Sequence, residues 1–471
     1  MLVVRAAAVL GVVALVVASG GSGTAAAIPP PIIDAGAVPP DTVGPERPMQ
    51  QRVQCQTPGV LPASNFADPP PGWRLLNLEA TRPFASGAGV TVAVIDTGVT
   101  PNPRLPHLRP GGDYVMDGDG LSDCDAHGTL VAGVIGAAPA PGDAFVGVAP
   151  EATLISIRQS STHFNLQNPT QSDDPNDSET GIDLRAEARA VVHAVNLGAS
   201  VINISMVSCL KAVRHADDSA LGAAVHWAVN ERNVVVVAAA GNTGGDCKQN
   251  PAPPGTDPGS WANVVTISSP SWWADDVLSV GSVQNDGTPS STTLHGPWVD
   301  LAAPGENVVS VGNFPDGRLV NALPGEDQVL VPLFGDSYSA AVVTGVVALV
   351  REKFPELTAR QVMYRLKATA HAGPTTPDPA IGWGVVDPLA ALTWNVPDPA
   401  PTLPVNSVIH PTPLPPGPDY QPRKFASYGL GGLAVVIVLA VGAWAALRRR
   451  DRKAGGSIHE RPISHYNNWL H

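Results

Sequence analysis

The sequence predicts an α/β fold in which a parallel sheet carries helices on both faces. From Val90 to Val283, short β-branched, apolar runs are separated by longer segments with helical patterning. Such runs fit strands that are buried on both faces. Strands that alternate with helices form parallel sheets, because each helix returns the chain to the same edge. The 471 residues are enough for one large core with an extension at each end.

The N-terminal region is predicted to contain a signal peptide and then an extension. Residues 6–18 are apolar, follow Arg5 and lead into small residues that end at Ala27. This run is short for a membrane span and fits the apolar part of a signal peptide covering residues 1–27. A retained anchor is the alternative. Residues 28–74 are proline-rich, and we expect them to wrap over the following domain, residues 75–396.

The first candidate functional residue is an acid at the end of a predicted strand. The run from Val90 to Ile95 is followed by Asp96, Thr97 and Gly98. An acid at the carboxyl end of a buried parallel strand lies at the edge where α/β proteins hold their sites. The alternative for an isolated aspartate there is a local turn.

The second candidate is His127, which opens a predicted helix of small and apolar residues. Gly128, Gly133 and Gly136 reduce the stability of this helix, so we expect close packing around them. A lone histidine is more often structural than catalytic. His127 is singled out because the chain carries other candidate residues of a hydrolase site before and after it.

A polar segment comes next, before the third candidate. Residues 159–182 separate the predicted strand Thr153–Arg158 from a predicted helix at Leu184–Leu197. We expect a surface loop, and loops of this length are uncommon unless they are functional or disordered.

Further on, the buried run from Val234 runs through Ala239, Ala240 and Gly241 to Asn242. The Asn242 amide can donate a hydrogen bond to a developing negative charge; the alternative is a turn.

The fourth candidate is Ser337, which follows Gly335 and Asp336 and precedes a long apolar helix, predicted at Ser339–Lys353. The free N–H groups at the start of such a helix can stabilise an oxyanion beside the serine. A further helix is predicted at Thr358–His371.

The order Asp96, His127, Ser337 is the subtilisin order of a catalytic triad, unlike the orders of trypsin and the α/β-hydrolases. Over residues 75–395 the chain resembles the subtilisin-like (subtilase) serine proteases. The matching motifs are VAVIDTGV, HGTLVAGVIGA, VVVVAAAGN and GDSYSAAVVTGV. The resemblance implies a subtilisin-like fold and a serine endopeptidase that acts on a protein or peptide.

In such an enzyme Ser337 attacks the peptide carbonyl and His127 takes its proton, while Asp96 holds the imidazole. The Asn242 side chain and the Ser337 N–H bind the oxyanion. The substrate pairs as an added strand with one segment, and a second segment resembles the wall of the P1 pocket. These segments are Ser205, Met206 and Val207, and Ala239, Ala240 and Gly241.

Two departures from the family pattern suggest a slow or highly selective enzyme. Asp336 stands where relatives usually have threonine, and Val207 and Ser208 stand where many have glycines. A carboxylate at 336 that faces the site would raise the pKa of His127 and oppose a negative intermediate; the alternative is that it points into solvent. A mainly structural subunit with weak or no proteolysis is the competing interpretation.

Composition excludes other classes of function. The net charge is −13 with 28 Lys and Arg residues, which argues against a nucleic-acid partner. The chain lacks a phosphate-binding glycine loop, a CxxC and an HExxH motif, so we expect no cofactor and no catalytic metal. Residues 117–120 (DGDG) are a weak calcium candidate and fit a turn better.

The four cysteines of an exported chain imply two disulfides. Cys209 and Cys247 each follow a predicted strand, and the two strands flank a predicted helix at Ser219–Arg232. Strands so connected lie side by side in parallel, so both cysteines leave the same sheet edge and are predicted to pair. Cys55 then pairs with Cys124 and ties the extension to the loop before His127.

The C-terminal region is predicted to anchor the chain in a membrane. Residues 397–424 form a proline-rich linker, either a spacer or a surface strap. Residues 425–447 carry no charge and can span a bilayer. The basic cluster after Leu447 places the tail, residues 448–471, in the cytoplasm. We therefore expect a single-pass protein of the cell membrane with its protease domain on the periplasmic side.

This layout resembles the mycosins, which are membrane-anchored subtilases of actinobacterial type VII secretion systems. The phrases CDAHGTLVAG and DSYSAA look mycosin-like, apart from Asp336. The resemblance implies a membrane-embedded type VII secretion complex as the partner. A surface protease without a fixed partner is a further alternative.

Overall fold

The computed structural model describes residues 28–169, 172–252, 257–397 and Trp444. The predicted signal peptide, nearly all of the linker, the predicted span apart from Trp444, and the tail lie outside these residues and stay predictions. Within the part that is described, no helix combines the length and apolar character needed to cross a membrane.

The centre of the domain is a seven-stranded sheet in the order β11-β10-β8-β6-β2-β4-β3. Every neighbouring pair is parallel, which confirms the predicted parallel sheet. Its strands are β2 (Thr91–Asp96), β3 (Leu108–Asp113), β4 (Thr153–Arg158), β6 (Val201–Ile204), β8 (Val235–Ala239), β10 (Val277–Val283) and β11 (Val299–Pro304). Strands β2, β6, β8 and β10 are almost wholly buried, as their mainly apolar sequences predict.

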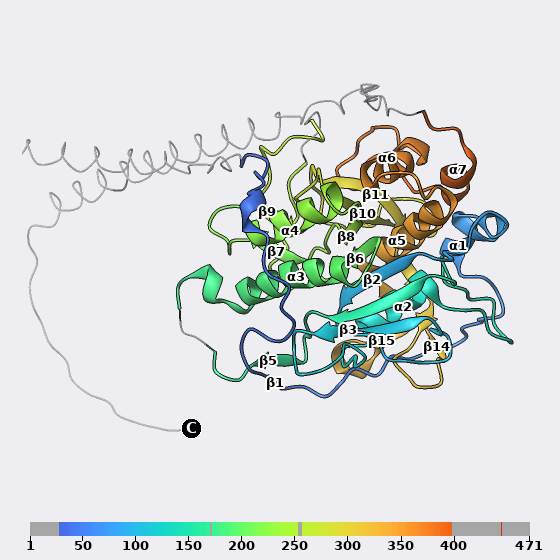
Figure 1. Cartoon of the computed structure of the whole chain (residues 1–471), viewed down its shortest axis with the longest axis horizontal. Coiled ribbons are helices and arrows are strands. Elements are labelled where there is room, and N and C mark those ends of the chain that lie inside the picture. The colour runs from blue at the N-terminus through green and yellow to red at the C-terminus, as the bar shows by residue number, and fades with distance from the viewer. Residues whose placement is uncertain (1–27, 170–171, 253–256, 398–443, 445–471) are drawn as a thin grey trace, which may run out of the picture. The chain divides into compact units, whose positions relative to one another are not determined.

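Helices cover both faces of the sheet. On one side α2 (His127–Gly136) packs against α5 (Asp336–Lys353), and on the other α3 (Glu179–Asn196) packs against α4 (Ser219–Asn230). Figure 1 shows the two pairs on opposite sides of the strands. The helices α6 (Ala359–Thr369) and α7 (Pro388–Thr393) follow α5 and pack against it.

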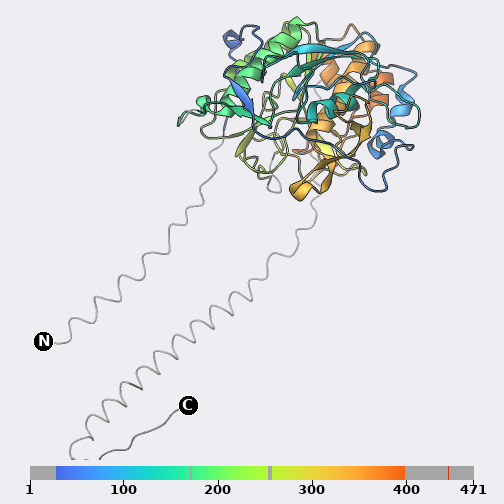
Figure 2. The same cartoon turned by 90° about the horizontal axis from the view of Figure 1, so that it is seen from below.

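The N-terminal extension runs along the outside of the domain (Figure 1, Figure 2). It contains η1 (Ala35–Ala37) and β1 (Met49–Gln51), and α1 (Pro71–Leu75) and η2 (Leu78–Thr81) follow at its junction with the domain. Strand β1 pairs antiparallel with β5 (Phe164–Leu166). A hydrogen bond between the His193 Nδ1 and Asp41 at 2.8 Å and an ion pair between Glu46 and Arg185 at 2.6 Å hold the extension on α3.

Several small elements were not predicted from the sequence pattern. They are η3 (Pro175–Asp177), β7 (Ser208–Lys211), β9 (Thr266–Ser269), β12 (Glu306–Val308), β13 (Ser310–Val311), β14 (Leu319–Val320), β15 (Ala322–Pro324), η4 (Glu326–Gln328) and β16 (Leu330–Phe334). These strands pair antiparallel in short ribbons. Strand β16 leads through Gly335 directly into α5.

Two helices begin earlier than predicted. Helix α3 begins at Glu179, not Leu184, because the Ser178 hydroxyl accepts a hydrogen bond from the Gly181 N–H and caps the helix. Part of the expected loop 159–182 is therefore β5, η3 and the first turn of α3. Helix α5 begins at Asp336, not Ser339, so Ser337 lies within its first turn.

Candidate active site

Three neighbouring strands deliver candidate residues to one edge of the sheet. Strand β2 ends at Asp96, β6 is followed by Ser205, and β8 is followed by Ala240, Gly241 and Asn242. These strands are adjacent in the order β8-β6-β2 and parallel. Their carboxyl ends therefore meet where open α/β sheets hold their sites.

Asp96 and His127 form a hydrogen-bonded pair at this edge. The Asp96 Oδ1 accepts from the Thr97 N–H at 2.8 Å and lies 2.7 Å from the His127 Nδ1. His127 is the first residue of α2. A Cβ on Gly128 would lie 2.1 Å from the Gly98 carbonyl oxygen and 3.1 Å from the Asp96 Oδ1. Glycine at 128 is what allows the helix to approach the strand and its acid so closely.

The electrostatics of this pair favour the charged imidazolium. Burial alone would lower the pKa of His127, but the Asp96 carboxylate raises it by charge and by hydrogen bonding. Asp123 and Asp125 add smaller contributions in the same direction. The pKa of His127 is therefore raised above its ordinary value.

Ser337 reaches the same edge on the first turn of α5. It follows Gly335, whose φ of 138° suits glycine. Its hydroxyl donates to the Ser205 carbonyl at 3.2 Å, and the Ser205 hydroxyl donates to the Ser337 carbonyl at 3.2 Å. The hydroxyl is thus turned toward Ser205, while the next side chain, Tyr338, has its ring centroid 5.8 Å from that of His127.

Asn242 lies against the turn that carries Ser337. Its Oδ1 accepts the Asp336 N–H at 3.0 Å. Because the oxygen of the amide is engaged in this way, the NH2 group is the part of the side chain that is left to donate to a ligand.

Asp336 points neither into the site nor into solvent, the two orientations considered from the sequence. Its side chain is fully buried, and its Oδ1 accepts from the Thr293 hydroxyl at 2.8 Å. Burial raises the pKa of Asp336 well above its ordinary value, although the hydrogen bonds from Thr293 and the Ser282 backbone oppose this. The raised pKa favours the neutral carboxyl, which reduces the repulsion that a carboxylate in the site would cause.

The predicted substrate-binding segments lie beside Ser337 and Asn242. Ser205 is buried, whereas Met206 and Val207 are half-buried, and Val207 packs against the hydrophobic core. The residues of the predicted P1 wall, Ala239, Ala240 and Gly241, are buried. The roles of these six residues in binding stay predictions.

The disulfides are Cys55–Cys124 and Cys209–Cys247, the two pairs predicted from the sequence. Beside the first pair, the Gln56 N–H donates to the Cys124 carbonyl at 2.7 Å. The extension is thereby fastened to the loop that ends at His127.

Asp123 is a buried neighbour of the site that the sequence analysis did not identify. Its Oδ1 accepts from the Thr97 hydroxyl at 2.9 Å, and its Oδ2 accepts from the Thr129 N–H and hydroxyl. Burial raises the pKa of Asp123 to about 7, against the effect of these hydrogen bonds. The signal in the sequence is an acid four residues before His127.

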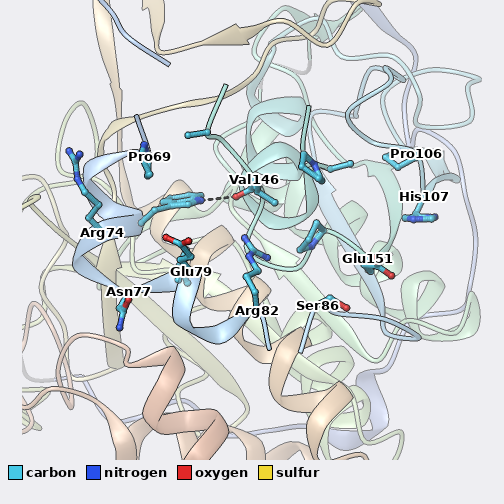
Figure 3. Close-up of a pocket in the computed structure, with 16 residues that line it drawn as sticks. Pro69, Arg74, Asn77, Glu79, Arg82, Ser86, Pro106, His107, Val146 and Glu151 are labelled. Carbon is cyan, nitrogen blue, oxygen red and sulfur yellow. Dashed lines mark hydrogen bonds between the residues drawn. The ribbon is translucent and has the colours of Figure 1, made fainter. Parts of the chain in front are cut away.

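Two features of the rest of the described structure are the absence of a metal cluster and the presence of a further cavity. Within the described ranges, no cluster of three or more His, Cys, Asp or Glu side chains could hold a metal ion. A cavity of about 760 Å³ lies between the α1–η2 segment and the loop around Val146, and the Trp73 indole N–H donates to the Val146 carbonyl there at 2.7 Å (Figure 3). None of the candidate catalytic residues lines this cavity.

Comparison with known proteins agrees with this arrangement. Residues 87–384 match the model of the Subtilase family. Mycosin-1 of Mycobacterium tuberculosis is 50% identical over 424 residues, which cover 89% of this chain and 94% of the relative.

Solved structures of mycosins are similar to this chain, and two of them illustrate the match. The crystal structure of MycP1 from the ESX-1 type VII secretion system has a TM-score of 0.77 and 52% identity, over 80% of this chain and 99% of that one. A chain in the periplasmic assembly from the ESX-5 inner membrane complex has a TM-score of 0.77 and 50% identity, over 83% of this chain and 100% of that one. The chain is therefore a member of the subtilase family of serine proteases and, within it, of the mycosins.

Proposed function

We propose that this chain is a serine endopeptidase with a narrow substrate range, in which Asp96, His127 and Ser337 form the catalytic triad. The observation that carries the proposal is the 2.7 Å bond between Asp96 and His127 at the sheet edge that also receives Ser337 and Asn242. His127 acts as the base, Asp96 holds its tautomer, and the Asn242 amide and Ser337 N–H receive the oxyanion. For the proton transfer, the Ser337 hydroxyl must rotate from the Ser205 carbonyl toward the imidazole.

The same proposal places the protease in a type VII secretion complex. A relative of 50% identity is a chain of the periplasmic assembly of such a complex. The uncharged run at 425–447, followed by basic residues, supports a single span with the protease domain on the periplasmic side and the tail in the cytoplasm. Extraction in mild detergent tests membership: a large assembly supports it, and a lone monomer contradicts it.

A mainly structural subunit is the second candidate function. It is favoured by the direction of the Ser337 hydroxyl, which bonds to Ser205, and by the half-buried Val207 beside the substrate path. A fluorophosphonate probe separates the two. Labelling of the folded chain that is lost in Ser337→Ala supports the protease; no labelling, with a competent subtilase labelled in parallel, supports the structural role.

A further inference from the structure

Asn242 and Thr293 form an antiparallel bridge between two segments that are distant in the chain. Each neighbour of Asn242 makes a backbone hydrogen bond to a neighbour of Thr293, and both bonds measure 2.7 Å. They run from the Thr243 N–H to the Thr292 carbonyl and from the Leu294 N–H to the Gly241 carbonyl. The backbone on both sides of Asn242 is thus tied to the segment that carries Thr293.

Asp336 contacts both members of this bridge. Its backbone N–H donates to the Asn242 Oδ1 at 3.0 Å, and its own Oδ1 accepts from the Thr293 hydroxyl at 2.8 Å. The direction of the second bond is fixed, because the Thr293 oxygen accepts the Ser282 N–H at 3.0 Å and keeps its hydrogen for Asp336. Asp336, Thr293 and Asn242 therefore close a ring of hydrogen bonds.

The ring is shielded from water where Asp336 and Thr293 meet, because both side chains are fully buried. Loss of their hydrogen bond would leave a buried polar group without a partner, which costs more than the bond itself contributes. The Asn242 amide also lies against the turn before α5, since a Cβ on Gly335 would lie 3.3 Å from its Nδ2. The amide is therefore restrained at its oxygen, through its backbone and by the packing of Gly335.

The carboxyl of Asp336 can serve in this ring without a charge. Burial raises the pKa of Asp336, and a neutral carboxyl still accepts a hydrogen bond through its carbonyl oxygen. The amide of asparagine has the same shape and also offers an acceptor oxygen. The ring should thus persist in Asp336→Asn and open in Asp336→Ala.

We propose that Asp336 is a positioning residue for the oxyanion site, because its side chain ties the segment that carries Asn242 to the first turn of α5. Ser337 is the next residue of that turn, so one residue sets the spacing between the nucleophile and the donor amide. The proposal rests on the proposed function, since it takes the Asn242 amide as the donor to the oxyanion. A donor that is not held in place in advance stabilises the transition state less, so we expect the effect in kcat more than in KM.

Peptide hydrolysis by the full chain in detergent tests this role. Asp336→Ala keeps the backbone bond to Asn242 and loses the bond to Thr293, and we expect kcat to fall by about tenfold or more while KM changes by less than about threefold. Asp336→Asn should restore kcat to within about threefold of the wild type. Thr293→Val should match Asp336→Ala. Thr369→Val, which removes a buried hydroxyl in α6, is the matched control and should leave kcat unchanged.

A double variant shows whether Asp336 acts through the amide. Asp336→Ala should add little to the loss of kcat in Asn242→Ala, because a donor that is absent cannot be misplaced. Losses that multiply in the double variant would overturn the proposal, and so would a wild-type kcat in both Asp336→Ala and Thr293→Val. A thermal scan confirms that each variant is folded, and Thr293→Val carries the test if Asp336→Ala is not.

Hydrogen exchange keeps this test apart from that of the proposed function. Deuterium uptake is measured by mass spectrometry in peptides that contain Thr243 or Leu294, whose N–H groups close the bridge. We expect faster uptake there in Asp336→Ala and Thr293→Val and wild-type uptake in Asp336→Asn. If a fluorophosphonate does not label the wild type, the proposed function fails and uptake alone decides; unchanged uptake in the first two variants would then overturn the positioning role. If the wild type is labelled and its kcat survives Asp336→Ala, the protease stands and the positioning role is wrong.

Discussion

His127 and Asp96 are 31 positions apart in the chain and share a 2.7 Å hydrogen bond at the carboxyl end of β2. If this bond holds the imidazole in the tautomer that can accept the serine proton, Asp96→Asn should lower kcat by about ten-thousand-fold, the size known for the same change in another Ser-His-Asp protease. The Tm should change little, because Asn fills the same space. Peptide hydrolysis and a thermal scan check this, and a loss below tenfold would remove Asp96 from the mechanism.

Asn242 has two functions that substitution can separate. Its oxygen accepts the Asp336 N–H, and its NH2 group is the proposed oxyanion donor. Asn242→Ala should lower kcat by about a hundred- to a thousand-fold. Asn242→Asp keeps the acceptor and loses the donor, so it should be at least as slow; recovery of activity in Asn242→Asp would show that support of the helix turn matters more than donation.

The rate should rise with pH, because His127 must be neutral to act as a base. The raised pKa of His127 predicts a midpoint above the ordinary value of 6.5. Asp123 favours the charged imidazole, so Asp123→Asn should move the midpoint of the kcat/KM profile to lower pH. Glu356→Gln, which removes an exposed carboxylate, serves as the control and should leave the midpoint unchanged. An unchanged midpoint in Asp123→Asn would contradict the coupling.

Asp336 predicts a dependence of stability on pH with a definite sign. Its pKa is raised in the folded protein, so the folded state keeps a proton that the unfolded chain releases above its ordinary pKa of 3.8. Stability from this group therefore declines as pH rises toward the folded pKa, by about 1.4 kcal/mol per pH unit. Asp336→Asn carries no such proton. The Tm of the variant should therefore increase relative to that of the wild type as the pH rises above about 4. Curves that stay parallel as the pH rises would show that the pKa of Asp336 is not raised.

The strands and the site edge were predictable because their signals are local. Mainly apolar, β-branched runs specify the central strands, Asp96 is the last residue of one of them, and Ser205 and Asn242 follow two others. The orientation of Asp336 was not predictable, because it depends on Thr293, which comes from a distant loop. The start of α3 was missed because the Ser178 cap lies within a segment that looks like a loop. Strand β1 was missed because its pairing with β5 joins segments more than a hundred residues apart.

The central claim is that Ser337 is a nucleophile activated by His127. Mass spectrometry of the tryptic peptides after fluorophosphonate treatment tests it most directly, with wild type, His127→Ala and Ser205→Ala compared under one set of conditions. The account predicts an adduct on Ser337 in the wild type, its loss in His127→Ala and its retention in Ser205→Ala, since the Ser337 hydroxyl bonds to the carbonyl of Ser205 and not to its side chain. An adduct on another residue, or equal labelling with and without the imidazole, would contradict it.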